Sequence, residues 1–285
     1  NSSPFESWLA AIVDVVAKAD NSYGSHRPIA VANWITTDPL SHPDEMAYTL
    51  EDIVSVDPLH VLPTDAWFGG VFASYHAYPY YPDFLRFEYE DFVDPFEEYL
   101  RQLKRVTKDM PLMITEVGLP TSIGIGHRGP LHRNQGGNSE VDQGKRVANI
   151  LEVIHKVGCQ AAFIFELNDE WFKRSWNIME LESPKHRRAA WFNPIGAEQH
   201  FGVIAVEPAS NLINSDGTIS STNHDWWTHS LLDATSDSSS DMLASKKKFR
   251  FEPVSNSVST KVTGGQNQLS NASSIAVVHD EAYLY

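Results

Sequence analysis

The segment Pro111-Leu112-Met113-Ile114-Thr115-Glu116 is a run of mostly apolar residues that ends in a threonine and a carboxylate. A short, nearly continuous apolar run is typical of a strand buried on both faces of a parallel sheet. Gly118 and Pro120 follow, so the chain turns directly after Glu116. The segment therefore predicts a buried strand that delivers a carboxylate to its own carboxyl end.

Three further apolar runs and three segments with helical spacing surround this strand along the chain. The strand-like runs cover residues 28–34, 70–76 and 161–166, and the helix-like segments cover residues 5–19, 92–108 and 141–157. Residues 44–54 are expected to form a loop with a short helix. Strands that alternate with helices, each strand being apolar throughout, favour an α/β fold with a parallel sheet covered on both faces.

Composition excludes several classes of partner. The 285 residues carry 22 basic and 37 acidic side chains, a formal net charge of −15. Such an acidic surface disfavours nucleic acid and anionic membranes, because phosphate binding depends on Lys and Arg. The basic run 246–250 is interpreted as a solvated loop. No stretch reaches about 18 consecutive apolar residues, so we expect no membrane span.

The sequence contains none of the motifs that hold a metal or a nucleotide cofactor. Cys159 is a lone cysteine in an apolar stretch, which predicts a buried structural thiol. The histidines include no His-Glu-x-x-His spacing, and no phosphate loop or Gly-x-Ser-x-Gly elbow is present. We therefore expect no metal and no cofactor.

Polar and aromatic residues follow each predicted strand. They are Asn33 and Trp34, Tyr75 and His76, Glu116, and Glu166 with Asp169. Ligand chemistry in parallel α/β folds lies at the carboxyl ends of the strands. A carboxylate there, with aromatic residues around it, is suited to act as a nucleophile or as an acid/base. The alternative is that Glu116 is an ordinary surface-loop glutamate.

Aromatic residues concentrate near the same strand ends. The set comprises Trp34, Trp67, Tyr75, His76, Tyr78, Tyr80, Tyr81, Trp171 and Trp176. Flat amphipathic side chains match the apolar faces and polar edges of sugar rings, although an ordinary core is the alternative. The proline-rich run 78–82 favours a loop platform over a strand. Residues 166–171 place four polar groups beside Trp171, either to bind sugar hydroxyls or to form a structural corner.

In combination these segments resemble the C-terminal half of a retaining glycoside hydrolase with a (β/α)8 barrel, of the β-galactosidase and cellulase group. ITEVGLPTS (114–122) is similar to the seventh strand, FASYHAYPYYPDF (72–84) to the sixth, VANWITTDPLSHPDE (31–45) to the fifth and IFELNDEWFKRSW (164–176) to the eighth. Residues 186–208 resemble the closing segment. The resemblance implies that residues 1–208 are half of a TIM barrel, strands five to eight, that Glu116 is the nucleophile, and that Tyr75, His76, Tyr78 and Trp171 lie around the sugar.

One element of that family pattern is missing. The resemblance implies an acid/base glutamate after an asparagine at the end of strand four, which precedes residue 1. We therefore expect a fragment that cannot hydrolyse a glycoside alone, whereas the intact parent does so by double displacement. A non-catalytic carbohydrate-binding barrel and a structural or surface protein are the alternatives.

Residues 209–285 have a different texture, rich in Ser, Thr, Asn, Asp and Gly. LINSDGTISSTNHDWW (212–227) and IAVVHDEAYLY (275–285) resemble the opening of a family-nine-type carbohydrate-binding β-sandwich. We expect a linker followed by the start of that domain. The expected partner is a carbohydrate, and the substrate class predicts an extracellular or cell-surface location; the oligomeric state has no signal in the sequence.

Overall fold

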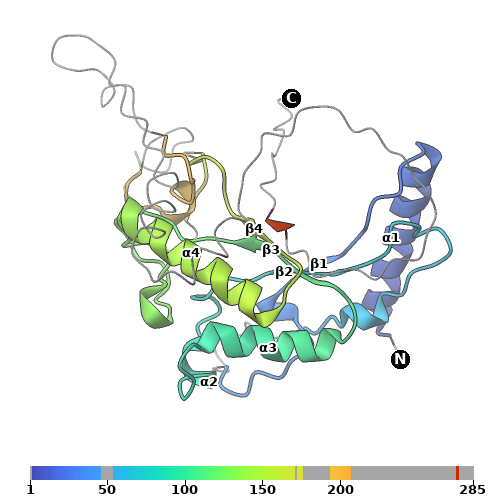
Figure 1. The fold of residues 1–285 in the computed structure, drawn as a ribbon, viewed down its shortest axis with the longest axis horizontal. Helices are drawn as coiled ribbons and strands as arrows, with labels where there is room; N and C mark the ends of the chain where they lie inside the picture. Colours follow the sequence, from blue (N-terminus) through green and yellow to red (C-terminus); the bar gives the residue numbers. More distant parts are fainter. Residues whose placement is uncertain (1, 46–53, 171, 176–192, 207–273, 276–285) are drawn as a thin grey trace, which may run out of the picture.

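The computed structural model describes residues 2–45, 54–170, 172–175, 193–206 and 274–275. Over these residues strands and helices alternate along the chain, and the strands lie side by side in one sheet (Figure 1). The fold is mixed α/β, as predicted. No helix among the described residues is long and apolar enough to cross a membrane.

Four strands form the parallel sheet in chain order. They are β1 (Ala32–Trp34), β2 (Ala73–His76), β3 (Leu112–Val117) and β4 (Ala161–Ile164). Every neighbouring pair is parallel. The strand predictions for all four apolar runs are confirmed, and each observed strand lies within its run or extends it by one residue. A parallel sheet whose strands follow one another in chain order is consistent with part of a TIM-barrel-like fold.

A fifth, two-residue strand, β5 (Ser274–Ile275), pairs in parallel with β4. These are the described residues of the region 209–285, and they extend the same sheet. The remainder of the predicted β-sandwich lies outside the described residues, so that domain stays a prediction.

The helices are α1 (Pro4–Ser22), α2 (Leu85–Glu88), α3 (Pro95–Thr107) and α4 (Glu140–Val157). Short 3-10 turns occur at η1 (Ile35–Thr37), η2 (Pro58–His60), η3 (Pro130–His132) and η6 (Ala197–Gln199). Side-chain caps define where the long helices start: Ser3 caps α1, Asp94 caps α3 and Ser139 caps α4. Gly158, with φ of +88°, ends α4 in the left-handed conformation that favours glycine.

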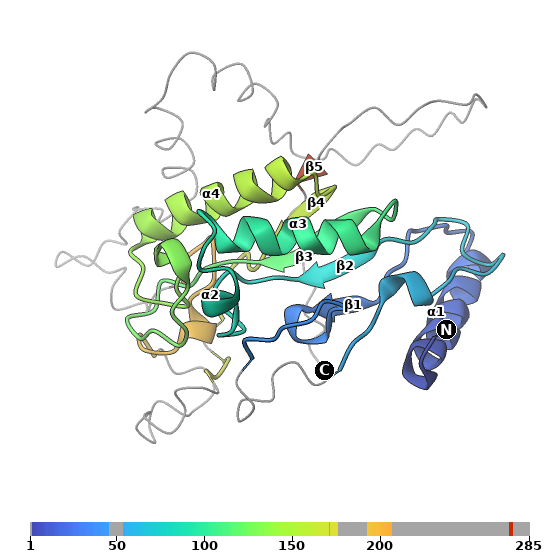
Figure 2. The same cartoon turned by 90° about the horizontal axis from the view of Figure 1, so that it is seen from below.

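The main core lies between the sheet and the pair α3–α4, which cover one of its faces (Figure 2). Tyr75 of β2 and Leu112 and Ile114 of β3 are fully buried there. From the helices, Leu100 and Ile150 are likewise completely buried. Cys159 is buried in the same core, and burial raises the pKa of its thiol to about 11, so the predicted structural thiol is confirmed.

Only some of the apolar residues of α1 are buried. Val13 and Ala17 are buried against Val61 and Trp67, but Trp8 is 55% exposed. Phe5, Ile12 and Val16 are also exposed. The predicted helix is confirmed. The described residues pack against only one side of it, so part of its apolar face stays exposed.

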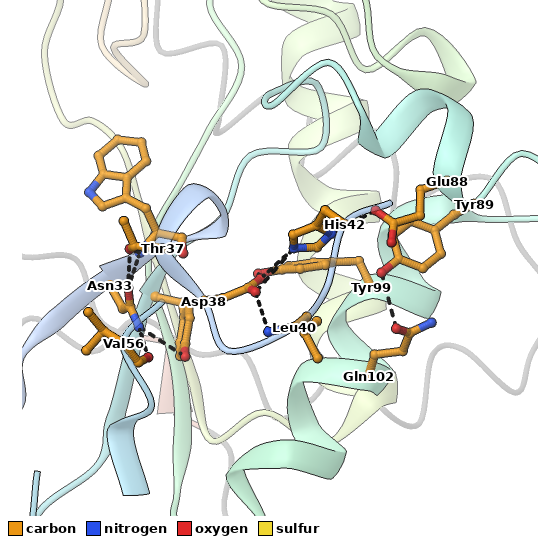
Figure 3. A network of polar contacts seen from close by, with 12 residues as sticks. Asn33, Thr37, Asp38, Leu40, His42, Val56, Glu88, Tyr89, Tyr99 and Gln102 are labelled. Carbon is orange, nitrogen blue, oxygen red and sulfur yellow. Dashed lines mark hydrogen bonds and ion pairs between the residues drawn. The ribbon is translucent and has the colours of Figure 1, made fainter. Parts of the chain in front are cut away.

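A buried polar network joins the loop after β1 to α2 and α3 (Figure 3). The imidazole of His42 bonds Glu88 Oε2 through Nδ1 (2.7 Å) and Asp38 Oδ1 through Nε2 (3.2 Å). Tyr99 donates its hydroxyl proton to Asp38 Oδ2 at 2.9 Å. Burial alone would lower the pKa of His42, but the hydrogen bonds to Asp38 and Glu88 outweigh burial and raise that pKa to about 9. The network therefore holds a charged imidazole between two carboxylates inside the protein.

Candidate active site

The strand register brings Trp34, His76 and Glu116 into one row across the carboxyl ends of three strands. Trp34 pairs with His76, and His76 pairs with Glu116. The second pairing depends on a bulge, because Tyr75 pairs with Ile114 and the register shifts before His76. Without that extra residue His76 would face Thr115. Bulges often re-aim a side chain next to a functional site, and here the bulge aligns the imidazole with the carboxylate.

Glu116 is held on one of its oxygens by two side chains from β2 and the loop after it. Tyr78 donates its hydroxyl proton to Glu116 Oε2 at 3.0 Å. His76 Nδ1 lies 3.0 Å from the same oxygen, but its direction does not meet hydrogen-bond geometry. The side chains of His76 and Glu116 remain 21% and 25% exposed. The carboxylate is therefore oriented and still reachable from solvent.

Gly118 allows the two strands to come together just beyond this carboxylate. A Cβ at Gly118 would lie 1.9 Å from the carbonyl oxygen of Phe165, which directly follows β4. Any larger residue would push the ends of β3 and β4 apart. The close approach of the Phe165 carbonyl therefore requires a glycine at position 118, two residues after Glu116.

Trp34 is the aromatic side chain that the row presents to solvent. The residue is 39% exposed. It contacts the His76 ring edge-on, with centroids 5.0 Å apart, and lies roughly parallel to the Tyr78 ring at 6.2 Å. A flat indole face beside a carboxylate suits a sugar ring, which has apolar C–H faces and polar edges.

Several aromatic residues of the predicted cluster lie in the core instead. Trp67 packs in the small core under α1, and Tyr75 is completely buried. Tyr78 and Tyr80 are 7% and 2% exposed, so the run 78–82 is packed inward and is not an open platform. The expectation of a broad aromatic surface is wrong for these residues because Trp67 packs in the small core with Val13 and Val61, and the three tyrosines pack in the main core. Trp171 and Trp176 lie outside the described residues.

Asn33 is also buried and has a structural set of contacts. Its amide donates to the carbonyl of Val56 (2.9 Å) and to the Tyr75 hydroxyl (3.3 Å), and its carbonyl oxygen accepts from the Trp34 backbone and the Thr37 hydroxyl. All its polar capacity is therefore used to shape the turn that carries Trp34.

The polar segment after β4 divides into two parts. Asp169 accepts backbone N–H groups from Gly202 (2.9 Å) and Val206 (3.1 Å), as expected of a structural corner. Glu166 bonds Lys173 at 2.9 Å, and Lys173 also contacts Glu170 at 2.7 Å. Burial raises the pKa of Glu166 to about 8, against the opposing effect of Lys173. Glu166 thus lies in a compact carboxylate–lysine cluster near the strand ends.

A second carboxylate near Glu116 has no signal in the sequence. Glu198, in η6, accepts a hydrogen bond from Gln135 Nε2 at 2.8 Å. Burial raises the pKa of Glu198, and the negative charge of Glu116 raises it further, while Lys173, Gln135 and His127 act in the opposite direction. Glu198 lies in an irregular segment, where no periodic pattern or strand end marks it. A search for carboxylates flanking the closing segment would have been needed to find it.

No group of three or more His, Cys, Asp or Glu residues in the described part of the chain is arranged to hold a metal ion. A surface cavity of about 440 Å³ lies elsewhere, lined among others by Arg86, Arg128 and His132, and it includes none of the strand-end residues. The row of Trp34, His76 and Glu116 remains the candidate site because it combines an accessible carboxylate with an exposed ring.

Comparison with known proteins gives limited further information. No protein-family model matches the sequence, and no curated protein matches it. Among solved structures, the chain is similar to the crystal structure of a glycoside hydrolase family 17 beta-1,3-glucanosyltransferase from Rhizomucor miehei. The identity is 16%, with a TM-score of 0.36, and the match covers 75% of this chain and 55% of that one. The chain thus spans about half the length of that structure, and the likeness is too weak to assign a function.

Proposed function

We propose that the protein acts on glycans, and that residues 1–208 are the C-terminal half of a retaining O-glycosyl hydrolase barrel with Glu116 as its nucleophile. The row that joins Trp34, His76 and Glu116 carries this proposal. It supplies an oriented, accessible carboxylate, which is one of the two carboxyl groups of a retaining glycosidase, beside an exposed indole that suits the face of a sugar ring.

In the proposed reaction the ionised Glu116 carboxylate attacks the anomeric carbon. The bond from that carbon to the glycosidic oxygen breaks, and the departing oxygen takes a proton from a second carboxyl group. Water then attacks the anomeric carbon, gives its proton to the second carboxylate and releases Glu116 as a free carboxylate. No residue of this chain is assigned as that acid/base, so the proposal predicts that the chain binds glycan without cleaving it.

The neighbours of Glu116 support the nucleophile's orientation. Tyr78 donates to Oε2 at 3.0 Å, and this hydrogen bond fixes the orientation of the carboxylate that attacks the sugar in the proposal. In the proposal Trp34 stacks on the sugar, and Trp171 provides a second face. Residues 209–285 form a linker and the start of a carbohydrate-binding β-sandwich, and the protein works outside the cell or at its surface.

Glycan binding by the full chain tests the proposal. Soluble β-linked glucan and mannan oligosaccharides are titrated into the protein in a calorimeter, with Trp34→Ala as the test variant. Phe68→Ala is the matched control, because Phe68 is an exposed aromatic residue, 69% accessible, outside the row. Saturable binding that is lost in Trp34→Ala and kept in Phe68→Ala is expected. Equal binding by both variants contradicts the proposed site.

The titration separates the proposed function from a structural protein, and covalent labelling of Glu116 separates it from a non-catalytic binder. A non-catalytic carbohydrate-binding barrel also binds through Trp34, but its Glu116 never forms a bond to sugar. A structural or surface protein binds none of the oligosaccharides. The two alternatives are therefore distinguished from the enzyme by covalent chemistry and by binding, respectively.

A further inference from the structure

The segment that carries η6 packs across the ends of β3 and β4. The backbone N–H of Thr121, just after β3, donates to the carbonyl of His200 at 2.9 Å. Beyond β4, Glu166 donates its N–H to Phe201 O (3.3 Å), and Val203 donates to Glu166 O (2.9 Å). The colour of residues 193–206 places them at the end toward which the strand arrows point (Figure 2). Residues 197–203 are therefore part of the same end of the sheet as Glu116.

Phe201 connects this segment to the tyrosine that holds Glu116. Its ring lies 6.0 Å from the Tyr78 ring and 5.3 Å from the Phe165 ring, edge-on in both cases. The Tyr78 ring in turn lies 5.5 Å from the Tyr80 ring. These contacts hold Phe201 against Tyr78, and Glu198 of η6 lies three residues before Phe201 in the chain.

Glu198 has hydrogen-bond partners within the fold, and it is more exposed than the residues on either side of it. Its neighbours Ala197 and Gln199 are each 1% exposed, whereas Glu198 is half-buried. Its backbone N–H donates to Ser175 Oγ at 3.0 Å, and its Oε1 accepts from Gln135 at 2.8 Å. The backbone N–H and the carboxyl group each have a defined partner, and the residue is only half-buried.

The charges of Glu198 and Glu116 act on the same two tyrosines, in agreement with the contacts of Phe201 and of the Thr121 backbone. The charges of both carboxylates raise the pKa of Tyr78 and of Tyr80, in addition to the larger effect of burial. Burial and the charge of Glu116 raise the pKa of Glu198, whereas Lys173, Gln135 and His127 lower it without reversing the shift. A carboxyl group beside a like charge keeps its proton to higher pH.

We propose that Glu198 is a glycan-binding residue of the Glu116 site, where its carboxylic acid donates a hydrogen bond to a sugar oxygen. The inference rests on the proposed function and extends it to a residue from the closing segment. A protonated carboxyl group offers one O–H donor and keeps acceptor capacity, so it can satisfy a hydroxyl or ring oxygen that a second carboxylate would repel. The site then combines the Glu116 carboxylate with a second carboxyl group whose pKa is raised by burial and by the charge of Glu116.

This assignment predicts a direction for pH dependence. Because the pKa of Glu198 is raised, its acid form persists above the range of an ordinary glutamate and disappears as pH rises through the raised value. Glycan affinity that needs the proton therefore falls with rising pH, by up to about tenfold per pH unit above that midpoint. The charged groups that face Glu198 are Glu116, Lys173 and His127, so the midpoint depends on all three.

Two measurements on the full chain test the inference. The first follows the carboxyl carbon of Glu198 by ¹³C NMR as pH changes, in the wild type and in Glu116→Gln. The midpoint of Glu198 is expected to fall when the charge of Glu116 is removed, and it should not move in Glu152→Gln, an exposed glutamate on α4. An identical Glu198 midpoint in wild type and Glu116→Gln overturns the inference, and this readout requires no ligand.

The second measurement is the pH profile of β-glucan and β-mannan oligosaccharide binding by Glu198→Gln. The amide of glutamine donates a hydrogen bond at every pH, so the variant is expected to bind within about threefold of the wild type at low pH and to lose the decline at high pH. A decline that persists in Glu198→Gln overturns this inference alone. Absence of binding by the wild type at every pH overturns the proposed function and this inference with it.

Discussion

Two carboxylate–histidine–tyrosine groups in this molecule use the same chemistry in opposite surroundings. In the first, Asp38 accepts from Tyr99 at 2.9 Å and bonds His42, and the carboxylate and imidazole side chains are fully buried. In the second, Glu116 accepts from Tyr78 at 3.0 Å with His76 Nδ1 at 3.0 Å, and both Glu116 and His76 stay partly exposed. The chemical types are thus matched, while their access to solvent differs.

The difference shows what makes a cluster of ionisable groups structural or functional. His42 has a carboxylate on each ring nitrogen, which leaves it no capacity for a ligand. His76 has one carboxylate neighbour at imperfect geometry, and the exposed ring of Trp34 lies beside it. The buried group contributes to folding, and the open group remains available for binding. Substitutions in the buried group should therefore change the free energy of unfolding, and substitutions in the open group should change glycan affinity.

The largest effect is expected on stability from His42→Ala. Removing the imidazole leaves the largely buried carboxylates of Asp38 and Glu88 without their cationic partner, which costs about 3–5 kcal/mol. Urea unfolding followed by circular dichroism measures the loss. His76→Ala is the matched control and should cost no more than about 1 kcal/mol, because that pair is partly exposed. Equal losses would remove the distinction between the two groups.

Raising the pH should lower the free energy of unfolding by an amount comparable to that of His42→Ala. The pKa of His42 is raised to about 9 in the folded state, and it is about 6.5 when unfolded. Its contribution is therefore complete below pH 6.5 and is lost as pH rises through 9, about 3 kcal/mol in total. Unfolding free energies at pH 6 to 10 measure this decline. His76→Gln should keep it and His42→Gln should flatten it, and a slope shared by all three proteins would contradict the assignment.

At the open group the expected effect is on binding. Trp34→Ala removes the exposed indole and should weaken glycan affinity by about 2 kcal/mol, or roughly thirtyfold, which is typical of a tryptophan hot spot. Its effect on the free energy of unfolding should be small, since Trp34 is 39% exposed. Isothermal titration and urea unfolding of the same samples separate the two quantities. A large stability loss with unchanged affinity would make Trp34 a core residue.

The smallest effect is expected from Tyr78→Phe, which removes the hydroxyl that donates to Glu116. The ring contacts with Trp34 and Phe201 remain, so the unfolding free energy should fall by about 1 kcal/mol. Reactivity of Glu116 toward a carboxyl-modifying carbodiimide, read by mass spectrometry, should change as its orientation is lost. Tyr89→Phe, which removes a hydroxyl bonded to Gln102 far from the row, should leave that reactivity unchanged.

The sheet could be predicted from sequence because its strands are buried on both faces. That burial requires continuous apolar runs, such as the one that ends at Glu116. The helices between the runs are recognised by apolar residues that recur at helical spacing. The position of Glu116 followed from the same pattern. The bulge that aligns His76 with Glu116 could not be predicted, because a one-residue register shift leaves no trace in hydrophobic pattern.

Long-range polar partners were the other unpredictable feature. Asp38 and His42 are four residues apart, but Glu88 and Tyr99 join them from distant segments. Glu198 meets Gln135 in the same way, from irregular segments without a repeating pattern. Conversely, Trp67 and Tyr80 were expected near sugar and are buried, because aromatic residues suit a core and a sugar platform equally well.

Covalent trapping tests the role of Glu116 most directly. The reagents are 2-deoxy-2-fluoro glucosides, mannosides and galactosides with a dinitrophenolate leaving group, which departs without a proton and so bypasses the acid/base carboxyl group. Attack by Glu116 forms the ester to the anomeric carbon and releases dinitrophenolate. The peptide that contains Glu116 should gain the mass of one fluoroglycosyl group, and Glu116→Gln should gain none. A label on another carboxylate, or no label with any of the three sugars, would contradict Glu116 as the nucleophile.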